Sequence, residues 1–375
     1  MGKPVFCVLG AGNGGLAMAG HLSLMGFEVR LYNRSPERLE PVIKMGGITL
    51  EGEIRGFGKI AVATSDPAEA VSGANVLMVV VPANGHRFIA QAVAPYLTDG
   101  QLIMLNPGRT FGALEFRQVL SSNGIKADLI IAEAQTLIYA ARATNPGQVR
   151  IFGIKNSIPV ASIQAYRIPE VLHLIHQAYP QFVPGDNIFK TSFDNIGAVF
   201  HPALTVLNAG WIEDDSEFQY YIQGCTPSVA QVLELIDAER VAVVAAVGVH
   251  AMTAKQWLYF AYGATGRNLF EAVHANSGYR GIMAPMSLHV RYLTEDIPMS
   301  LVPIASLGEM LGVATPIIKS VVDLASALVG IDFWNEGRTV EKLGIKGMSV
   351  RELRRLAIGE EEKKDERTDS GSDHR

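Results

Sequence analysis

The sequence has 375 residues, is 48% hydrophobic and carries a formal net charge of −5 at pH 7. This length exceeds one compact core and predicts two domains. The mild acidity and the lack of a Lys/Arg cluster argue against nucleic acid as a partner. The longest apolar run, 241–252, is too short to cross a bilayer, so it predicts a buried helix and no membrane partner. The two cysteines argue against a disulfide framework and favour a cytoplasmic location.

Short apolar runs alternate with amphipathic segments between residue 1 and about residue 155. The runs are VFCVLG, FEVRLY, NVLMVVVP, QLIMLNP and LIIAEA. Continuous apolar strands are typical of a parallel sheet that is buried on both faces, so they predict a doubly wound α/β, or Rossmann, domain. The Gly-rich segment between 43 and 65 interrupts the alternation and predicts an inserted hairpin.

After about residue 185 the pattern changes to long helical stretches. One helix is expected over about 195–210, and another begins near Thr226, an N-cap that is followed by Pro227. The second helix is apolar around much of its circumference, which places it at the centre of a helical domain or in a homodimer interface. We therefore predict a Rossmann domain over 1–185, an all-α substrate and dimerisation domain over 186–358 and a disordered tail over 359–375.

The segment GAGNGG at 10–15 lies between the first strand and the first helix and satisfies the pattern G-x-G-x-x-G. Gly10 ends the strand, Gly12 lets the backbone approach a pyrophosphate, and Gly15 lets helix and strand pack closely. The helix N-terminus directs its N–H groups at the phosphate. We expect a bound dinucleotide here, with Asn13 and Gly14 in the same turn.

The second predicted strand is followed by Asn33, Arg34 and Ser35, where an NAD-specific site usually has an acidic residue. Arg34 and Ser35 can instead hold a 2'-phosphate, because a guanidinium forms paired charge-assisted bonds and stacks on adenine. In the alternative, Arg34 is a solvated loop residue and Asn33 alone binds ribose, which permits NAD. The sequence favours NADP over NAD.

Two further strand ends carry prolines at the edge where a doubly wound sheet presents its ligand crevice. Val81 and Pro82 end one strand, and Asn106 and Pro107 end the next. We expect Val81, Pro82 and Pro107 to contact the nicotinamide. Alternatively, each proline only stops its strand.

A nicotinamide needs a group that exchanges a proton when hydride moves, and histidine changes charge near neutral pH. Of nine histidines, His173 and His176 have the spacing of a metal pair but lack a nearby third ligand, so we expect a solvated face and no metal. His201 lies on a predicted helix with Asn195 and Asn208, which put polar groups along an apolar stretch. A cofactor cleft would give this stripe its partners, although a core histidine bonded to backbone fits as well.

Four segments together resemble the octopine/nopaline (opine) dehydrogenase family. They are GAGNGG at 10–15, AEAQTLIYAARA at 132–143, DNIGAVFHP at 194–202 and VRYLTEDIP at 290–298. The resemblance covers nearly the whole chain apart from the tail. It implies a second, all-α domain that is similar to the C-terminal domain of 6-phosphogluconate dehydrogenase.

The resemblance also implies the chemistry. In that family a His and an Asp form the proton-transfer pair and an Arg five residues before the Asp holds a substrate carboxylate, which implies His201, Asp296 and Arg291 here. The implied reaction is a reductive condensation of a 2-oxo acid, such as pyruvate, with an amino acid to a secondary amine dicarboxylate, and its reverse.

Three alternatives stay open from the residues alone. Asp296 or Thr294 can cap a helix while Arg291 forms a surface ion pair. A simple 2-oxo-acid or ketopantoate-type reductase is a second alternative, although the long helical region has no lysine between Lys190 and Lys255. A non-catalytic NADP-sensing protein is the third.

Overall fold

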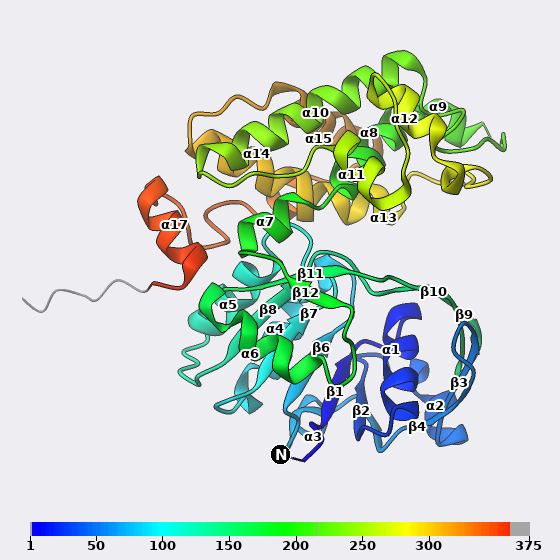
Figure 1. The fold of residues 1–375 in the computed structure, drawn as a ribbon, viewed down its shortest axis with the longest axis vertical. Coiled ribbons are helices and arrows are strands. Elements are labelled where there is room, and N and C mark those ends of the chain that lie inside the picture. The colour runs from blue at the N-terminus through cyan, green and yellow to red at the C-terminus, as the bar shows by residue number, and fades with distance from the viewer. Residues whose placement is uncertain (1, 215, 361–375) are drawn as a thin grey trace, which may run out of the picture.

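The structure is a computed structural model that describes residues 2–214 and 216–360. Figure 1 shows a sheet domain and, above it, a helical domain. The predicted tail lies outside the described residues except for Gly359 and Glu360. Within the described ranges we find no helix with the length and hydropathy that a bilayer crossing requires.

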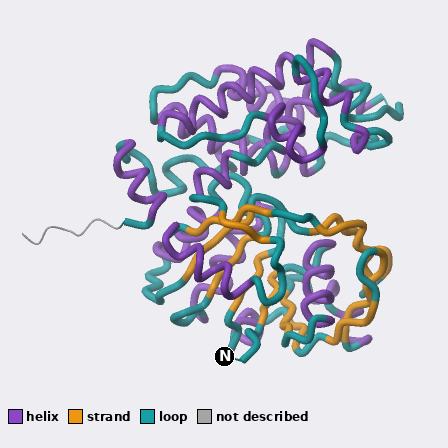
Figure 2. Tube along the Cα trace, viewed as in Figure 1, coloured by secondary structure: helices purple, strands orange, loops and turns teal. Residues whose placement is uncertain are grey.

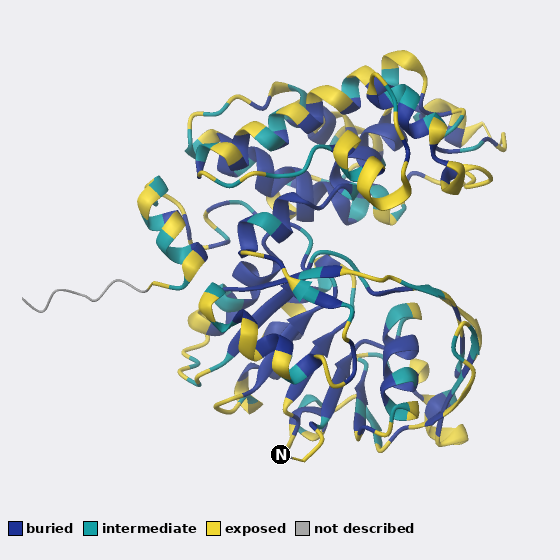
Figure 3. Ribbon diagram, in the orientation of Figure 1, coloured by how far each residue is buried: buried dark blue, intermediate teal, exposed yellow. Residues whose placement is uncertain are grey.

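The core of the first domain is an eight-stranded sheet with the order β12-β11-β8-β7-β6-β1-β2-β5. Its strands are β1 (Phe6–Leu9), β2 (Val29–Tyr32), β5 (Val62–Thr64), β6 (Val76–Val79), β7 (Leu102–Leu105), β8 (Ile130–Ala134), β11 (Ile158–Ser162) and β12 (Phe182–Pro184). The five predicted apolar runs form β1, β2, β6, β7 and β8, which are parallel and, apart from the half-buried Arg30 of β2, buried. Figure 3 shows this buried core.

The sheet is mixed at one position outside the five predicted runs. Strand β11 runs antiparallel to β8. After β8 the chain leaves the sheet through β9 (Tyr139–Asn145) and β10 (Gln148–Ile154) and returns at the carboxyl edge of β8, so it has to run back in the opposite direction.

A second, four-stranded sheet has the order β4-β3-β10-β9. The predicted hairpin is confirmed as β3 (Gly47–Gly52) and β4 (Gly56–Lys59), which pair antiparallel. Helix α1 (Asn13–Leu24) lies between the two sheets, because it contacts β1 and β2 on one side and β3, β4, β9 and β10 on the other (Figure 1). The remaining helices of this domain are α2 (Glu40–Met45), α3 (Pro67–Val71), α4 (His86–Val93), α5 (Gly112–Ser122) and α6 (Ile168–Ile175).

The second domain is built from helices (Figure 2). They are α7 (Ile188–Phe193), α8 (Gly197–Leu207), α9 (Ala209–Glu213), α10 (Pro227–Ala246), α11 (Ala254–Tyr262), α12 (Leu269–Ala275), α13 (Arg291–Thr294), a π-helix (Ile297–Leu301), α14 (Val302–Met310), α15 (Pro316–Val329), α16 (Phe333–Glu336) and α17 (Val350–Ile358). Helix α10 is central as predicted, since it packs against α7, α8, α12, α14 and α15.

Three predictions about the ends of helices can be compared with the structure. The Thr226 hydroxyl accepts a hydrogen bond from the N–H of Val229 and so caps α10 as expected. The expected helix over 195–210 is divided at Asn208 into α8 and α9. The expected buried helix over 241–252 ends at Ala246, because Gly248 adopts a positive φ of 77° that α-helix does not permit.

A buried arginine joins the end of the chain to the first domain. Arg338 is 1% exposed, and its guanidinium donates to Glu115, to the carbonyls of Ala83, Gly108 and Thr110, and to Nδ1 of His86. These groups belong to the loops after β6 and β7 and to the helices that follow. Arg338 therefore holds two loops at the carboxyl edge of the sheet in one arrangement.

The contact with Arg338 requires a neutral His86, and this makes the stability dependent on pH. Burial and then the charges of Arg338 and Arg109 lower the pKa of His86 well below its ordinary value. Below about pH 6.5, His86 therefore binds a proton in the unfolded chain but stays neutral in the folded protein. The free energy of unfolding falls as the pH drops below this value. We expect His86→Gln to flatten this fall by about 1.4 kcal/mol per pH unit.

Denaturant unfolding at a series of pH values between 7 and 5 measures this slope. His173→Gln is the matched control, because His173 is exposed on α6. Equal slopes for the wild type and His86→Gln would show that His86 does not carry the pH dependence.

Candidate active site

The glycine turn after β1 fits the diphosphate of a dinucleotide. Gly10 has φ of +121°, and a Cβ there would lie 2.4 Å from the carbonyl oxygen of Val80. A Cβ on Gly15 would lie 1.8 Å from the carbonyl oxygen of Gly10, so the turn can close only with glycine at both positions. A Cβ on Gly12 would meet nothing within 4 Å, which leaves space for a ligand beside the N-terminus of α1.

A cleft of about 570 Å³ opens beside this turn. Of the residues predicted to contact the cofactor, those that line it are Gly10, Gly12, Asn33, Arg34, Ser35, Val81 and Pro82. The guanidinium of Arg34 lies over the ring of Phe88, 5.4 Å from its centre, and Arg38 lines the same cleft. Asn33 braces the turn, since its Oδ1 accepts from the N–H of Ala11 at 3.0 Å.

The other predicted cofactor contacts lie around the cleft. The Oδ1 of Asn13 accepts from the N–H of Ala143 at 2.9 Å and so ties α1 to β9. A Cβ on Gly14 would lie 2.8 Å from Leu137, and Pro107 follows a cis peptide bond in the loop after β7. A direct contact between these residues and the cofactor stays a prediction.

The structure brings His201 and Asp296 together from positions 95 residues apart. Nδ1 of His201, on α8, lies 2.8 Å from Oδ2 of Asp296, which directly precedes the π-helix. The Asp296 side chain is 2% exposed and that of His201 is 21% exposed. Burial alone would raise the pKa of Asp296, but the charge of Arg109 and the hydrogen bond from His201 outweigh it and lower the pKa below its ordinary value.

The ionised state of Asp296 determines which nitrogen of His201 carries the proton. An ionised carboxylate only accepts hydrogen bonds, so Nδ1 of His201 carries the proton that Asp296 holds. Nε2, the other ring nitrogen, lies 3.1 Å from the hydroxyl of Tyr221. Burial raises the pKa of Tyr221 well above its ordinary value, so this hydroxyl keeps its proton and can donate it to Nε2. Nε2 is therefore the atom of His201 that can exchange a proton with a substrate.

The helix and two tyrosines fix the position of the His201 ring. The backbone carbonyl of His201 accepts from the hydroxyls of Thr205 and Tyr220, each at 2.8 Å. The ring stacks on Tyr292, with 4.4 Å between the ring centres. Of the predicted polar stripe, Asn195 belongs to this site, whereas Asn208 donates to the carbonyls of Leu204 and Gly224.

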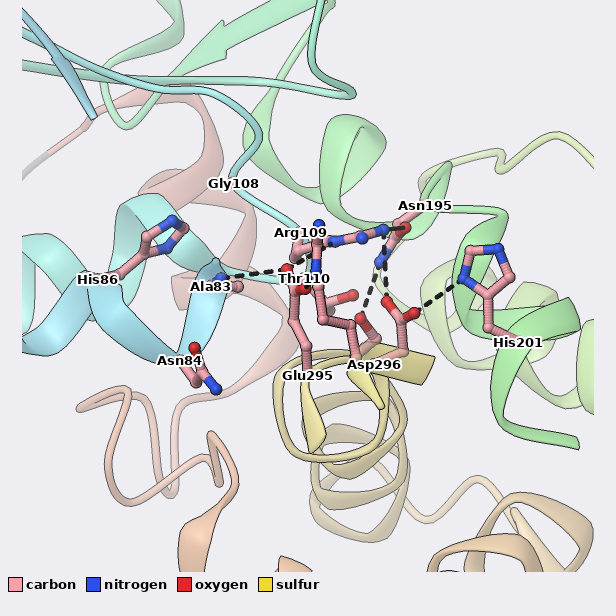
Figure 4. Close-up of polar contacts among 12 residues, drawn as sticks. Ala83, Asn84, His86, Gly108, Arg109, Thr110, Asn195, His201, Glu295 and Asp296 are labelled. Atoms are coloured by element: carbon pink, nitrogen blue, oxygen red, sulfur yellow. Dashed lines mark hydrogen bonds and ion pairs between the residues drawn. The ribbon is translucent and has the colours of Figure 1, made fainter. Parts of the chain in front are cut away.

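Arg109 joins the two domains at this point (Figure 4). It follows β7, and its guanidinium forms ion pairs at 3.3 Å with Glu295 and with Asp296 and donates to Oδ1 of Asn195 at 3.2 Å. Burial opposes the charge of Arg109, but Asp296 and Glu295 raise its pKa above the ordinary value, so it stays cationic. The N–H of Ala83 donates to Oε1 of Glu295 at 3.1 Å and completes the chain of contacts.

Arg291 lies on α13, within the same segment as Asp296. Its Nε donates to Oε2 of Glu295 at 2.6 Å, while 64% of its side chain is exposed. Arg291 thus forms the surface ion pair that the alternative reading of this segment expected. The contact uses Nε and leaves the outer nitrogens of the guanidinium toward solvent. The alternative that Asp296 caps a helix is wrong, because its carboxylate caps no N–H of the π-helix and instead pairs with His201.

Sequence reasoning missed Arg109, Glu295 and Tyr221. The available signals were weak. Arg109 follows a strand that ends in proline, and Glu295 lies beside Asp296 in the quoted segment. His173 on α6 and His176 directly after it are exposed as expected, and the described residues include no group of three metal-ligating side chains.

Comparison with known proteins agrees with this arrangement. Residues 184–329 match the family described as NAD/NADP octopine/nopaline dehydrogenase, alpha-helical domain, and residues 5–110 match the NAD binding domain of 6-phosphogluconate dehydrogenase. The opine dehydrogenase of Arthrobacter sp. (strain 1C) is 40% identical over 350 residues, which cover 93% of this chain and 97% of that protein. Octopine dehydrogenase of Pecten maximus is 26% identical, with 90% and 93% covered.

A solved octopine dehydrogenase with NADH and L-arginine has the same fold. It superposes with a TM-score of 0.80 at 23% identity and covers 96% of this chain and 99% of that one. The combined sequence and fold evidence spans both domains. The chain therefore belongs to the opine dehydrogenase family of NAD(P)-dependent oxidoreductases.

Proposed function

We propose that this protein catalyses the NADPH-dependent condensation of a 2-oxo acid with the amine of an amino acid, and the reverse reaction. The observation that carries the proposal is the His201–Asp296 pair, which lies beside Arg109 and Arg291 where the helical domain meets the carboxyl edge of the sheet. The ligands of related octopine dehydrogenase structures, NADH with L-arginine or with pyruvate, support this class of substrate.

The residues present account for the proton movements of this reaction. When bound, the nicotinamide supplies or accepts a hydride. As the amine attacks the carbonyl carbon, Nε2 of His201 takes a proton from the amine nitrogen and then gives it to the oxygen, which departs as water and leaves the imine. Asp296 keeps Nδ1 protonated throughout and stabilises the ring while it is charged. The outer nitrogens of Arg291 hold one substrate carboxylate through two parallel bonds, which orients that substrate in the site.

The adenine end of the cleft favours NADP. Residues 33–35 include no carboxylate that would repel a 2'-phosphate, and Arg34, Ser35 and Arg38 line the cleft there. Phe88 holds the guanidinium plane of Arg34 where it can both stack and bind phosphate.

We expect Arg34→Ala to weaken NADPH binding about 10- to 100-fold, since one charge-assisted hydrogen bond contributes about 1.5–3 kcal/mol. NADH binding should change less than about threefold because NADH lacks the phosphate that this bond needs. Calorimetric titration of both cofactors measures the two effects. Arg34→Lys, which keeps the charge but not the planar fork, should lie between the wild type and the alanine variant. Equal losses for NADPH and NADH would show that Arg34 does not bind the 2'-phosphate.

The function itself is tested by NADPH oxidation with pyruvate alone and with pyruvate plus a panel of amino acids. The proposal expects turnover that needs the amine, and mass spectrometry should detect the secondary amine dicarboxylate. Turnover without amine would identify a simple 2-oxo-acid reductase. NADPH binding with no turnover for any 2-oxo acid would identify a sensing protein.

We also propose a homodimer in the cytoplasm. Both cysteines, Cys7 and Cys225, are free and buried, which fits a reducing compartment. Helix α11 exposes Tyr259, Phe260 and Tyr262, and large exposed apolar side chains in one place are typical of a protein interface. Light scattering coupled to gel filtration should give the mass of two chains, and a single-chain mass would contradict the dimer.

A further inference from the structure

Lys155 lies at the edge of the sheet that carries the site. It directly follows β10, in the segment that leads to β11 along the side of the sheet domain facing the helical domain (Figure 1). Its backbone N–H donates to the carbonyl of Ile138 at 3.0 Å, and its Nζ donates to Oγ1 of Thr136 at 2.6 Å. Thr136 is two residues beyond the end of β8, so both residues lie at a carboxyl strand end.

The neighbours of Thr136 place this pair between the cofactor turn and the Arg109 cluster. Leu137 packs on Gly14 of the glycine turn. On the other side, Gln135 donates to the carbonyl of Asp194 at 2.8 Å, and the next residue, Asn195, accepts from Arg109. A group held by Lys155 therefore lies between the dinucleotide turn and the residues that surround Asp296.

The charge of Lys155 has no carboxylate partner among the described residues. No carboxylate there lies within ion-pair distance of its Nζ, whereas Arg109 and Arg291 both pair with Glu295. Lys155 is exposed, so a ligand can reach it, although the surrounding protein and the charge of Arg109 lower its pKa to about 8. An accessible cation without a carboxylate partner can form a charge-assisted hydrogen bond with an anion that binds there.

We propose that Nζ of Lys155 binds the carboxylate of the 2-oxo acid. This inference rests on the proposed function and adds a second carboxylate-binding cation to Arg291. Hydride adds to the former carbonyl carbon, so that carbon has to reach the cofactor side of the cleft, and the carboxylate is attached directly to it. Of the two substrates, the 2-oxo acid is thus the one whose carboxylate must lie near the cofactor turn. The hydroxyl of Thr136 directs Nζ toward it.

The test compares Lys155→Met with the wild type, using pyruvate and the amino acid that the wild type accepts best. We expect KM for pyruvate to rise roughly 10- to 100-fold, the effect of losing one charge-assisted bond, with the NADPH dissociation constant unchanged. Lys155→Arg should recover part of the loss. Lys59→Met is the control, because Lys59 is an exposed lysine at the end of β4 in the neighbouring sheet.

The outcomes separate this inference from the function on which it rests. An unchanged KM for pyruvate, an equal rise in the KM values of both substrates, or a weaker NADPH affinity would overturn the role of Lys155 while the condensation activity of the wild type stood. Absence of condensation by the wild type would contradict the proposed function itself. In that case calorimetric binding of pyruvate to the NADP complex, compared between wild type and Lys155→Met, still tests the carboxylate site.

Discussion

His201→Gln should lower kcat by about 10²- to 10⁴-fold, the usual contribution of a positioned acid or base, and leave the NADPH dissociation constant unchanged. Glutamine can still donate to Asp296, but it cannot carry a proton between water and substrate. The loss therefore reports on proton transfer at Nε2 and not on the fold of α8. Single-turnover kinetics with saturating NADPH separate the chemical step from product release.

A second variant tests whether Asp296 acts through His201. Since Asp296 holds the tautomer of the ring at 2.8 Å, the double variant His201→Gln/Asp296→Asn should lose about as much as His201→Gln alone. His289→Gln is the matched control, because His289 is an exposed histidine of the same domain. If His201→Gln keeps kcat within a few-fold of the wild type, another group transfers the proton.

The charges of the site suit an anionic substrate. Three cations surround the site. Glu295 pairs with Arg109 and Arg291, and Asp296 pairs with Arg109, whereas Lys155 donates to the hydroxyl of Thr136. The charge of Arg109 keeps Asp296 ionised, and both of these carboxylates are used in binding it. Arg291 and Lys155 have donors that these carboxylates do not use. In the proposed function Arg109 therefore maintains the proton-transfer pair, and Arg291 and Lys155 bind substrate carboxylates.

Much of the sheet domain could be predicted because its strands and its turn have strong local signals. Buried parallel strands show as apolar runs, and Gly10 and Gly15 are required by contacts within the turn. The sheet formed by β3, β4, β9 and β10 could not be predicted as a unit. The run 139–154 alternates small, polar and charged residues, such as Arg142 and Arg150, and its pairing with β3 joins segments about 100 residues apart.

The candidate site likewise contains residues that the sequence identified and residues that only the structure revealed. His201, Asp296 and Arg291 were identified through the family resemblance, since residue patterns alone left a core histidine and a helix cap open. The signal of Arg109 was too weak to identify it, because a single arginine after a strand is common on protein surfaces. Its importance comes from contacts to Asn195 and Glu295, 86 and 186 residues away, which only the assembled domains create. A site that forms between domains is specified by the fold and not by local spacing.

Arg338→Met should cause the largest loss of stability, about 3–5 kcal/mol, because it removes the buried partner of Glu115, leaving only the more exposed Arg87 at 3.4 Å, and removes a donor from three carbonyls. Arg338 and Glu115 are 1% and 5% exposed in their side chains, and the two lie 2.7 Å apart. Arg338→Lys should recover little, since one ammonium cannot reach groups in so many directions. Guanidinium denaturation measures the loss, and Arg267→Met, which removes a surface ion pair with Glu271 of α12, should leave the midpoint unchanged.

The same variant also tests how the site is held together. Arg338 binds the carbonyls of Gly108 and Thr110 on either side of Arg109, whose φ of +57° is strained for a side-chain-bearing residue. In Arg338→Met the loop should relax, so kcat should fall under conditions where the protein remains folded and binds NADPH normally. Adding Glu115→Gln removes the buried charge that has lost Arg338 and should restore part of the stability, but not kcat, because the carbonyls beside Arg109 still lack the guanidinium. Recovery of both by the second substitution would show that Arg338 stabilises Glu115 alone and does not position Arg109.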